Sequence, residues 1–287
     1  MNLTLTPYAR RHRNAVMALR FHSQRTHTHL DWHRAVNWLD RHEQRVYLVC
    51  EGERLIGFWG ISEAMGGAAW VRLLAIHDRA DATNTLSALW QTSQPYLYKQ
   101  GIRRVFLLVS ESWLEACLPE IGFEKYEMVV TMFRKQNETT LPDIAPHHIK
   151  VRDIYFDDLK HVLRIDNAAF PVPWQMSHDE LYQSVRIASS TTLALQDNQI
   201  VGYQVSTRHQ RHGHLARLAV DTTLQGRGIA KILLHHMIER TSRRGIRSIS
   251  VNTQDTNMRS QHLYEQFGFQ RNFYDLPVFS ADVQEQV

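Results

Sequence analysis

The chain has 287 residues, of which 43% are hydrophobic and 22% are charged, and its formal net charge is +4. This length favours two domains, and the composition is that of a globular protein rather than a disordered or fibrous one. No apolar run approaches the roughly 20 residues that span a bilayer, and no signal-peptide pattern opens the chain. We therefore expect no association with membranes. The two cysteines, Cys50 and Cys117, form no paired motif, and we expect a protein of the reducing cytoplasm.

Nucleic acids and metals are two further partners to consider. The 33 basic and 29 acidic residues are spread over both halves, which argues against nucleic-acid binding. His27, His29 and His33 lie close in sequence, but no cysteine or acidic cluster with metal-ligand spacing accompanies them. We therefore expect no metal. The histidines are expected around the start of a helix that begins near Asp31 and buries Trp32, Val36 and Leu39.

The first half begins its regular pattern with a strand-like run at residues 47–50, followed by a polar turn and a second strand. An extended run, a helix, a strand and a last helix closed by a glycine follow. The same order recurs at an offset of roughly 145 residues, which indicates an internal repeat. Three pairs of segments carry it: Leu55–Phe58 with Ile200–Tyr203, Lys99–Arg103 with Arg243–Arg247, and Ile121–Lys125 with Phe267–Arg271.

The periodic pattern breaks at residues 136–146, where polar residues and two prolines predict a linker. We therefore predict a first domain at 1–135 and a second at 147–287. The second domain starts with an edge strand at residues 149–153 and a helix that ends near Asp166. Strands and helices mixed in this order predict an α/β or α+β fold.

In the second domain, the apolar run Leu215–Val220 predicts a central strand buried on both faces. A turn follows, and helical spacing of apolar residues begins at Ile229. Gly226 and Gly228 therefore lie where free amides and the positive end of the helix dipole can hold a diphosphate. The next segments read as a strand at 248–252, a polar helix entry at 255–257, and a helix closed by a glycine at 268.

These two segments resemble the two signatures of the Gcn5-related N-acetyltransferase (GNAT) family. Residues 225–230, Gln-Gly-Arg-Gly-Ile-Ala, fit the first signature, and Asn257 to Phe269 fit the second, with Ser260 at its alanine. Residues 169–174, Ala-Phe-Pro-Val-Pro-Trp, are similar to the branch that acetylates a ribosomal-protein alanine. The resemblance implies two tandem domains, each with a mixed central sheet flanked by helices.

The resemblance also implies acetyl-coenzyme A as the acyl donor and a primary amine, of a small molecule or a protein N-terminus, as the acceptor. It places the pantetheine arm along the backbone of Leu218, Ala219 and Val220, and Asn257 and Tyr264 beside the thioester. The coenzyme's pyrophosphate would be bound by the loop and helix start, Gln225, Gly226, Arg227, Gly228, Ile229, Ala230 and Lys231.

Chemistry suggests roles for individual residues of this site. A backbone amide near Leu218 would stabilise the oxyanion of the tetrahedral intermediate. Tyr264, with an ordinary pKa of about 10, is the candidate proton donor to the departing thiolate. Without the asparagine and glycine signatures, it would be interpreted as an aromatic that packs beside Leu263 and Phe267. The ribosomal-protein branch has a glutamate at the position of Asn252, and asparagine takes no proton. His214 is therefore the candidate base, with ordered water or a plain surface histidine as alternatives.

The first half lacks these features. Its corresponding loop, residues 78–84, has no glycine and carries two acidic residues that repel a diphosphate, and Leu118 stands in the place of Tyr264. We interpret it as a degenerate domain whose tryptophans, Trp32, Trp38, Trp59 and Trp70, form its core or line an acceptor groove. A coenzyme-A-binding sensor without turnover is the main alternative function, because Asn252 leaves no evident base.

Overall fold

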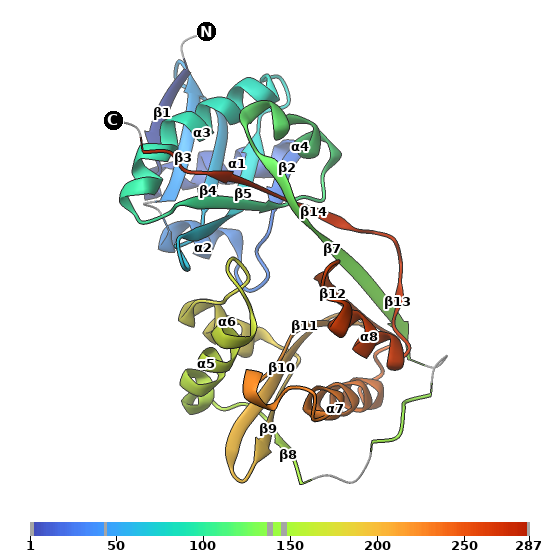
Figure 1. Ribbon diagram of the computed structural model, residues 1–287. Coiled ribbons are helices and arrows are strands. Elements are labelled where there is room, and N and C mark those ends of the chain that lie inside the picture. The colour runs from blue at the N-terminus through green and yellow to red at the C-terminus, as the bar shows by residue number, and fades with distance from the viewer. Residues whose placement is uncertain (1–2, 43–44, 137–139, 145–147, 286–287) are drawn as a thin grey trace. The chain divides into compact units, whose positions relative to one another are not determined.

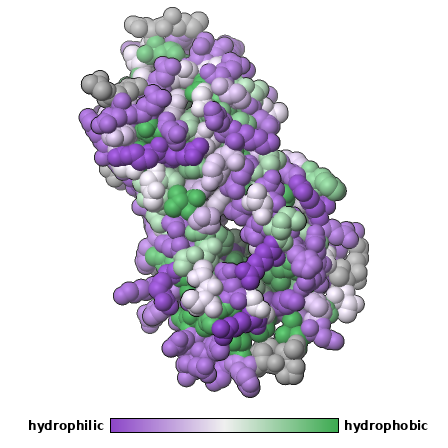
Figure 2. Space-filling model, viewed as in Figure 1, coloured by the Kyte–Doolittle hydropathy of each residue, from purple (hydrophilic) through white to green (hydrophobic). Residues whose placement is uncertain are grey.

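The computed structural model describes residues 3–42, 45–136, 140–144 and 148–285 (Figure 1). They form two compact units, one of Met1–Glu127 with Leu276–Val287 and the other of Met128–Asp275. Each unit has the predicted mixed sheet flanked by helices. Most of the face seen in Figure 2 is hydrophilic. Among the described residues, no helix is both long and apolar enough to cross a membrane.

The first unit has the strand order β1-β3-β4-β5-β6-β14, and β2 pairs with β5 beside this path. One core packs on α3 and a second on the face that includes Val16 of α1 and Trp38 of α2. Its strands are β1 (Leu3–Pro7), β2 (Arg25–Thr28), β3 (Val46–Glu51), β4 (Arg54–Ile61), β5 (Ala68–Ile76), β6 (Arg104–Leu108) and β14 (Leu276–Asp282). Its helices are η1 (Arg10–His12), α1 (Arg13–His22), α2 (Ala35–Arg41), α3 (Ala82–Lys99), α4 (Ser112–Cys117) and η3 (Pro119–Ile121).

The second unit has the strand order β7-β12-β11-β10-β9-β8, and β13 pairs with β7. Its strands are β7 (Glu124–Lys135, of which residues 128–135 belong to this unit), β8 (Lys150–Arg152), β9 (Ser190–Gln196), β10 (Gln199–His209), β11 (His212–Val220), β12 (Ser248–Gln254) and β13 (Gln270–Arg271). Its helices are η4 (Phe156–Asp158), α5 (Leu159–Ala169), α6 (His178–Ile187), η5 (Thr222–Leu224), α7 (Ile229–Arg243) and α8 (Met258–Gln266).

The compact units do not coincide with the predicted division at 136–146. The last strand, β14, pairs with β6, and Phe279 and Ala281 join the first unit's core (Figure 1). Residues 129–135 of β7 pair instead with β12. Gln136 is buried in the second unit, where its Nε2 donates to Thr241 Oγ1 at 3.0 Å. Each unit therefore includes a strand from the other half of the sequence; residues 137–139 and 145–147 of the predicted linker lie outside the described residues.

The segment around the clustered histidines also differs from the prediction. The helix begins at Ala35 rather than near Asp31, and it buries Trp38 and Leu39. His27 is not at a helix start but in β2, buried, with its Nδ1 3.1 Å from Glu111 Oε2. Within the described ranges, no group of three or more His, Cys, Asp or Glu side chains has a geometry suited to a metal. Of the four tryptophans predicted for the core or an acceptor groove, Trp38, Trp59 and Trp70 are buried.

Candidate functional site

Strands β11 and β12 of the second unit are parallel and separate part way along their length. Their pairing ends at Leu215 opposite Val251. Beyond that pair, β11 stays paired with β10 up to Val220, and β12 stays paired with β7 up to Gln254. Within the described chain, residues 216–220 and 252–254 therefore have no strand partner on their facing edges. We call this opening the wedge; its closed end lies at the last paired residues.

The β11 side of the wedge is the segment predicted to hold the pantetheine arm. A register shift between Val205 and Ser206 of β10 leaves Ala216 without an opposite residue, which is a β-bulge at the closed end. Past the bulge, alternate backbone N–H and C=O groups of β11 point away from β10. Leu218, Ala219 and Val220 can therefore offer hydrogen bonds to an extended, amide-containing ligand.

The glycine loop follows directly after this edge. Gly226 and Gly228 have φ of +84° and +82°, in the left-handed region that only glycine adopts readily. Helix α7 begins at Ile229, and its first internal bond runs from Ile232 N to Gly228 O at 3.2 Å. Among the described residues, none accepts a hydrogen bond from the amides of residues 226–231. Six free donors at a helix N-terminus suit an anion with several oxygens.

Side chains around the loop add positive charge. Arg227 and Lys231 are exposed, as predicted ligands of the pyrophosphate must be. Arg259, in the first turn of α8, was not predicted: its Nη1 donates to Gln225 Oε1 at 2.8 Å, and its Nη2 lies 3.4 Å from where a Cβ on Gly226 would be. The sequence places Arg259 two residues after the helix cap Asn257, but it does not show that the side chain reaches the glycine loop. The tertiary structure brings it there.

Tyr264 is buried in α8 and belongs to the core cluster that also includes Leu215 and Val251, the last paired residues of the wedge. Leu218 packs against the same cluster. Among the described residues, none forms a hydrogen bond with the Tyr264 hydroxyl. Burial raises the pKa of Tyr264 above its ordinary value, so the side chain is a neutral phenol at physiological pH.

Asn257 has a structural role. It is the N-cap of α8, and its Oδ1 accepts a hydrogen bond from Ser260 N at 3.1 Å. The cap fixes the start of the helix that carries Arg259 and Tyr264. The predicted position beside the thioester stays a prediction.

His214 lies at the closed end of the wedge, opposite Ser250 in the β11–β12 ladder. Its Nδ1 is 2.9 Å from Ser250 Oγ, which orients the ring. Because side chains alternate along a strand, His214 lies on the opposite face from Leu215, whose core cluster includes Tyr264. Asn252, one residue past the last pair on β12, is exposed. The side chain of His214 therefore lies on the face of the sheet opposite to the core that contains Tyr264.

The first unit has the same parting of strands, but there the opening is filled. Its parallel pairing of β5 with β6 ends at Trp70 opposite Phe106. Beyond that pair, residues 73–76 of β5 pair with β4 on one edge and with β2 on the other. Strand β2 thus occupies the edge that corresponds to the free edge of β11 in the second unit.

Two further contacts hold β2 in that place. Gln24 N donates to Asp78 Oδ1 at 2.9 Å, and Arg25 Nη1 donates to Ala80 O at 2.7 Å, so the loop before α3 is already bonded. The Oδ1 of Asp81 caps α3 by accepting from Asn84 N. The loop predicted to repel phosphate therefore has its groups engaged by the chain itself.

Residues 159–269, which include α5 to α8, match the family model described as Acetyltransferase (GNAT) family. The ribosomal protein bS18 alanine N-acetyltransferases of Haemophilus ducreyi and Haemophilus influenzae are 28% and 26% identical over 132 and 125 residues. These matches cover 44% and 42% of this chain and 90% and 84% of the relatives.

Among solved structures, a GCN5-related N-acetyltransferase from Sphaerobacter thermophilus superposes over 99% of this chain and 97% of its own, with a TM-score of 0.63 and 14% identity. A tandem GNAT protein from the clavulanic acid biosynthesis pathway superposes over 100% of both chains, with a TM-score of 0.66 and 13% identity. These two likenesses show that the whole chain shares the fold of these two structures.

Proposed function

We propose that this chain, whose residues 159–269 form an acetyltransferase domain of the GNAT family, transfers an acetyl group from acetyl-coenzyme A to the α-amine of a peptide or protein. The observation that carries the proposal is the wedge beside six free amides. An extended thioester can bind there with its diphosphate on Gly226–Lys231, its amide-containing arm on residues 218–220, and its acetyl group toward the closed end.

The reaction at that end is a direct attack of the amine nitrogen on the thioester carbon. Negative charge then develops on the former carbonyl oxygen, and the backbone amide near Leu218 can stabilise it. When the carbon–sulfur bond breaks, one proton must travel from nitrogen to sulfur. Tyr264 can donate its proton to the sulfur and recover one from the nitrogen, directly or through water. Its raised pKa favours this relay over release of a free tyrosinate.

The acceptor class follows from acid–base chemistry and from the relatives. An α-amine, with a pKa of about 8, is about one-tenth neutral at pH 7, whereas a lysine amine, at about 10.4, is almost wholly charged. Asn252 cannot take a proton, so the site suits an amine that needs little help. The relatives in the two Haemophilus species are named for a ribosomal-protein alanine, which makes an N-terminal alanine the first acceptor to test.

We further propose that only the second unit binds the coenzyme. In the first unit, β2 covers the strand edge that the pantetheine arm would need, and Asp78 and Asp81 lie where the diphosphate would lie. The first unit then acts as a scaffold, without a site of its own for the coenzyme.

Calorimetric titration of the full chain with acetyl-coenzyme A tests both statements. We expect one site per chain and, with a peptide that begins with alanine, release of free coenzyme A. Two sites would contradict the closed first unit. No binding would refute the acetyltransferase function, and binding without transfer to any amine would favour the coenzyme sensor instead.

A further inference from the structure

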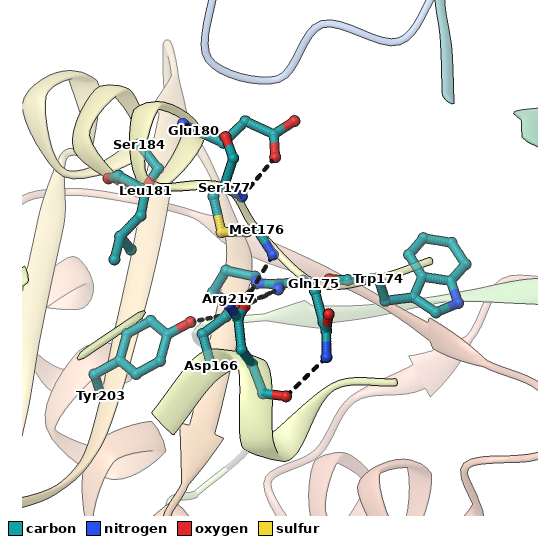
Figure 3. Close-up of polar contacts among 11 residues, drawn as sticks. Asp166, Trp174, Gln175, Met176, Ser177, Glu180, Leu181, Ser184, Tyr203 and Arg217 are labelled. Carbon is teal, nitrogen blue, oxygen red and sulfur yellow. Dashed lines mark hydrogen bonds and ion pairs between the residues drawn. The ribbon is translucent and has the colours of Figure 1, made fainter. Parts of the chain in front are cut away.

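A charged cluster is buried on the face of β11 that carries α5 and α6 (Figure 3). Asp166 of α5 is fully buried, and its Oδ1 accepts from Arg217 Nε at 3.0 Å and from Arg217 Nη2 at 2.7 Å. The Tyr203 hydroxyl of β10 donates a further bond to the same oxygen. The cluster connects α5 to the two strands that form one side of the wedge.

The same two charged side chains hold the segment between α5 and α6. Arg217 Nη2 donates to the Trp174 carbonyl at 2.7 Å, and the guanidinium lies 3.8 Å from the ring centroid of Phe170. Asp166 Oδ2 accepts from the backbone amide of Met176 at 3.1 Å. Figure 3 shows Trp174, Gln175 and Met176 passing over the cluster toward α6. We call residues 170–176 the Trp174 loop.

The Trp174 loop and the glycine loop lie on opposite faces of β11. Arg217 and Leu218 are neighbours in the strand, so their side chains point to opposite faces. Leu218 packs with Val220, Ile229 and Leu233, which is the α7 face. A ligand whose diphosphate binds at the start of α7 therefore enters from that side. Its acetyl group, at the closed end, would then meet an amine that comes from the opposite face, on which the Trp174 loop lies.

A buried ion pair of this kind contributes little to the stability of a core. Burying two charges carries a desolvation penalty for each ion, and apolar side chains of similar volume often stabilise a protein as well or better. The ion pair provides hydrogen bonds of defined direction. The Arg217 guanidinium donates to the Trp174 carbonyl, and the Asp166 carboxylate accepts from the Met176 amide. These bonds fix the position of the loop's backbone relative to β11, the strand on one side of the wedge.

We propose that Arg217 and Asp166 are positioning residues for the amine acceptor: they fix the Trp174 loop as the wall against which the acceptor peptide binds. This inference rests on the proposed acetyl transfer. It predicts that losing the cluster weakens binding of the acceptor and leaves binding of acetyl-coenzyme A unchanged.

The main test is the double variant Asp166→Leu with Arg217→Met, which removes both charges together and leaves neither buried alone. We expect KM for a peptide that begins with alanine to rise at least tenfold, while Kd for acetyl-coenzyme A stays within about twofold. Hydrogen exchange of the amides of residues 174–176 should become faster. The matched control is Arg152→Met with Asp158→Leu, an ion pair of the same unit at 2.6 Å whose hydrogen bonds among the described residues are all to residues 152–158 and not to the Trp174 loop.

Arg217→Lys is the second variant, because it keeps the charge but loses the fork that reaches both Asp166 and the Trp174 carbonyl. It should raise the same KM by a smaller factor. An unchanged KM in a folded double variant would overturn the positioning role, as would an equal loss of affinity for acetyl-coenzyme A. A parent protein that binds acetyl-coenzyme A but acetylates no amine would overturn the proposed function itself, and this inference with it.

Discussion

Replacing Tyr264 with phenylalanine separates catalysis from stability, because the structure gives its hydroxyl no partner among the described residues. The ring keeps its place against Phe269, 5.8 Å between centroids, so packing is preserved. No buried partner is left without a hydrogen bond, and the free energy of unfolding should change by less than about 1 kcal/mol. In the transition state of the proposed reaction, by contrast, the departing sulfur would lose its proposed proton donor.

The expected loss of turnover is about 10²- to 10⁴-fold, the range for general acid catalysis, which corresponds to about 3–5 kcal/mol in the barrier. Turnover is measured with saturating acetyl-coenzyme A and a peptide that begins with alanine, and Kd for acetyl-coenzyme A by calorimetry. The Kd should stay within a few-fold, because the diphosphate and arm contacts are unchanged. Equal turnover for Tyr264→Phe and the parent would refute the reasoning.

Tyr203→Phe is the matched comparison for stability. It makes the same chemical change at a second buried tyrosine, but there the hydroxyl donates to Asp166. Loss of that bond should cost about 1–3 kcal/mol. If both variants were equally destabilised, Tyr264 would have a partner that the geometry does not reveal, and its availability to the thioester would be in question.

Three further predictions concern the loop, the base and acid stability. Gly228→Glu should abolish binding of acetyl-coenzyme A in calorimetry. A Cβ at residue 228 would meet no protein atom within 4 Å, so the new carboxylate would project into the proposed diphosphate site and repel the diphosphate. Retained binding would refute the loop's role. If His214 is the base, His214→Ala should lower kcat/KM for the peptide about 10²-fold at pH 7. The value of kcat/KM should recover as the pH rises through about 8, where the α-amine loses its proton without a base. His212, whose Nδ1 contacts Ser248 as that of His214 contacts Ser250, is the control, and His212→Ala should leave kcat/KM unchanged. Burial, with Arg72 nearby, lowers the pKa of His29 to about 3, so the unfolded chain takes up the proton first. The contribution of His29 to the free energy of unfolding is then fully present above about pH 6.5 and is lost as the pH drops toward 3, by up to about 1.4 kcal/mol per pH unit. In urea titrations, the free energy of unfolding of His29→Gln should depend less steeply on pH in this range.

Several features of the site were predictable from the sequence because they are local. The pair Gly226 and Gly228 requires left-handed backbone just before a helix, and that requirement is visible in the residue types. The apolar run of β11 and the asparagine cap of α8 are equally local. These features identified the GNAT family from six residues and one helix, and the match over residues 159–269 confirms it.

The division of strands between the units was not predictable. Strand β14 completes the first unit and residues 129–135 complete the second, although the predicted domains assigned each to the other half. Strand β2 fills the first unit's opening, where a helix start was expected near Asp31. Backbone donors and acceptors are the same in every residue, so periodicity can indicate a strand but not the edge with which it pairs.

The chemistry of the sequence therefore predicted a binding site in the second unit: a diphosphate on its glycine loop and an extended arm on the strand before it. The tertiary structure decided which unit has that strand edge free, and it brought Arg217 to Asp166 and Arg259 to Gln225 across long stretches of chain. Such contacts join residues 51 and 34 positions apart. They depend on how the helices pack on the sheet, which no local pattern of residues records.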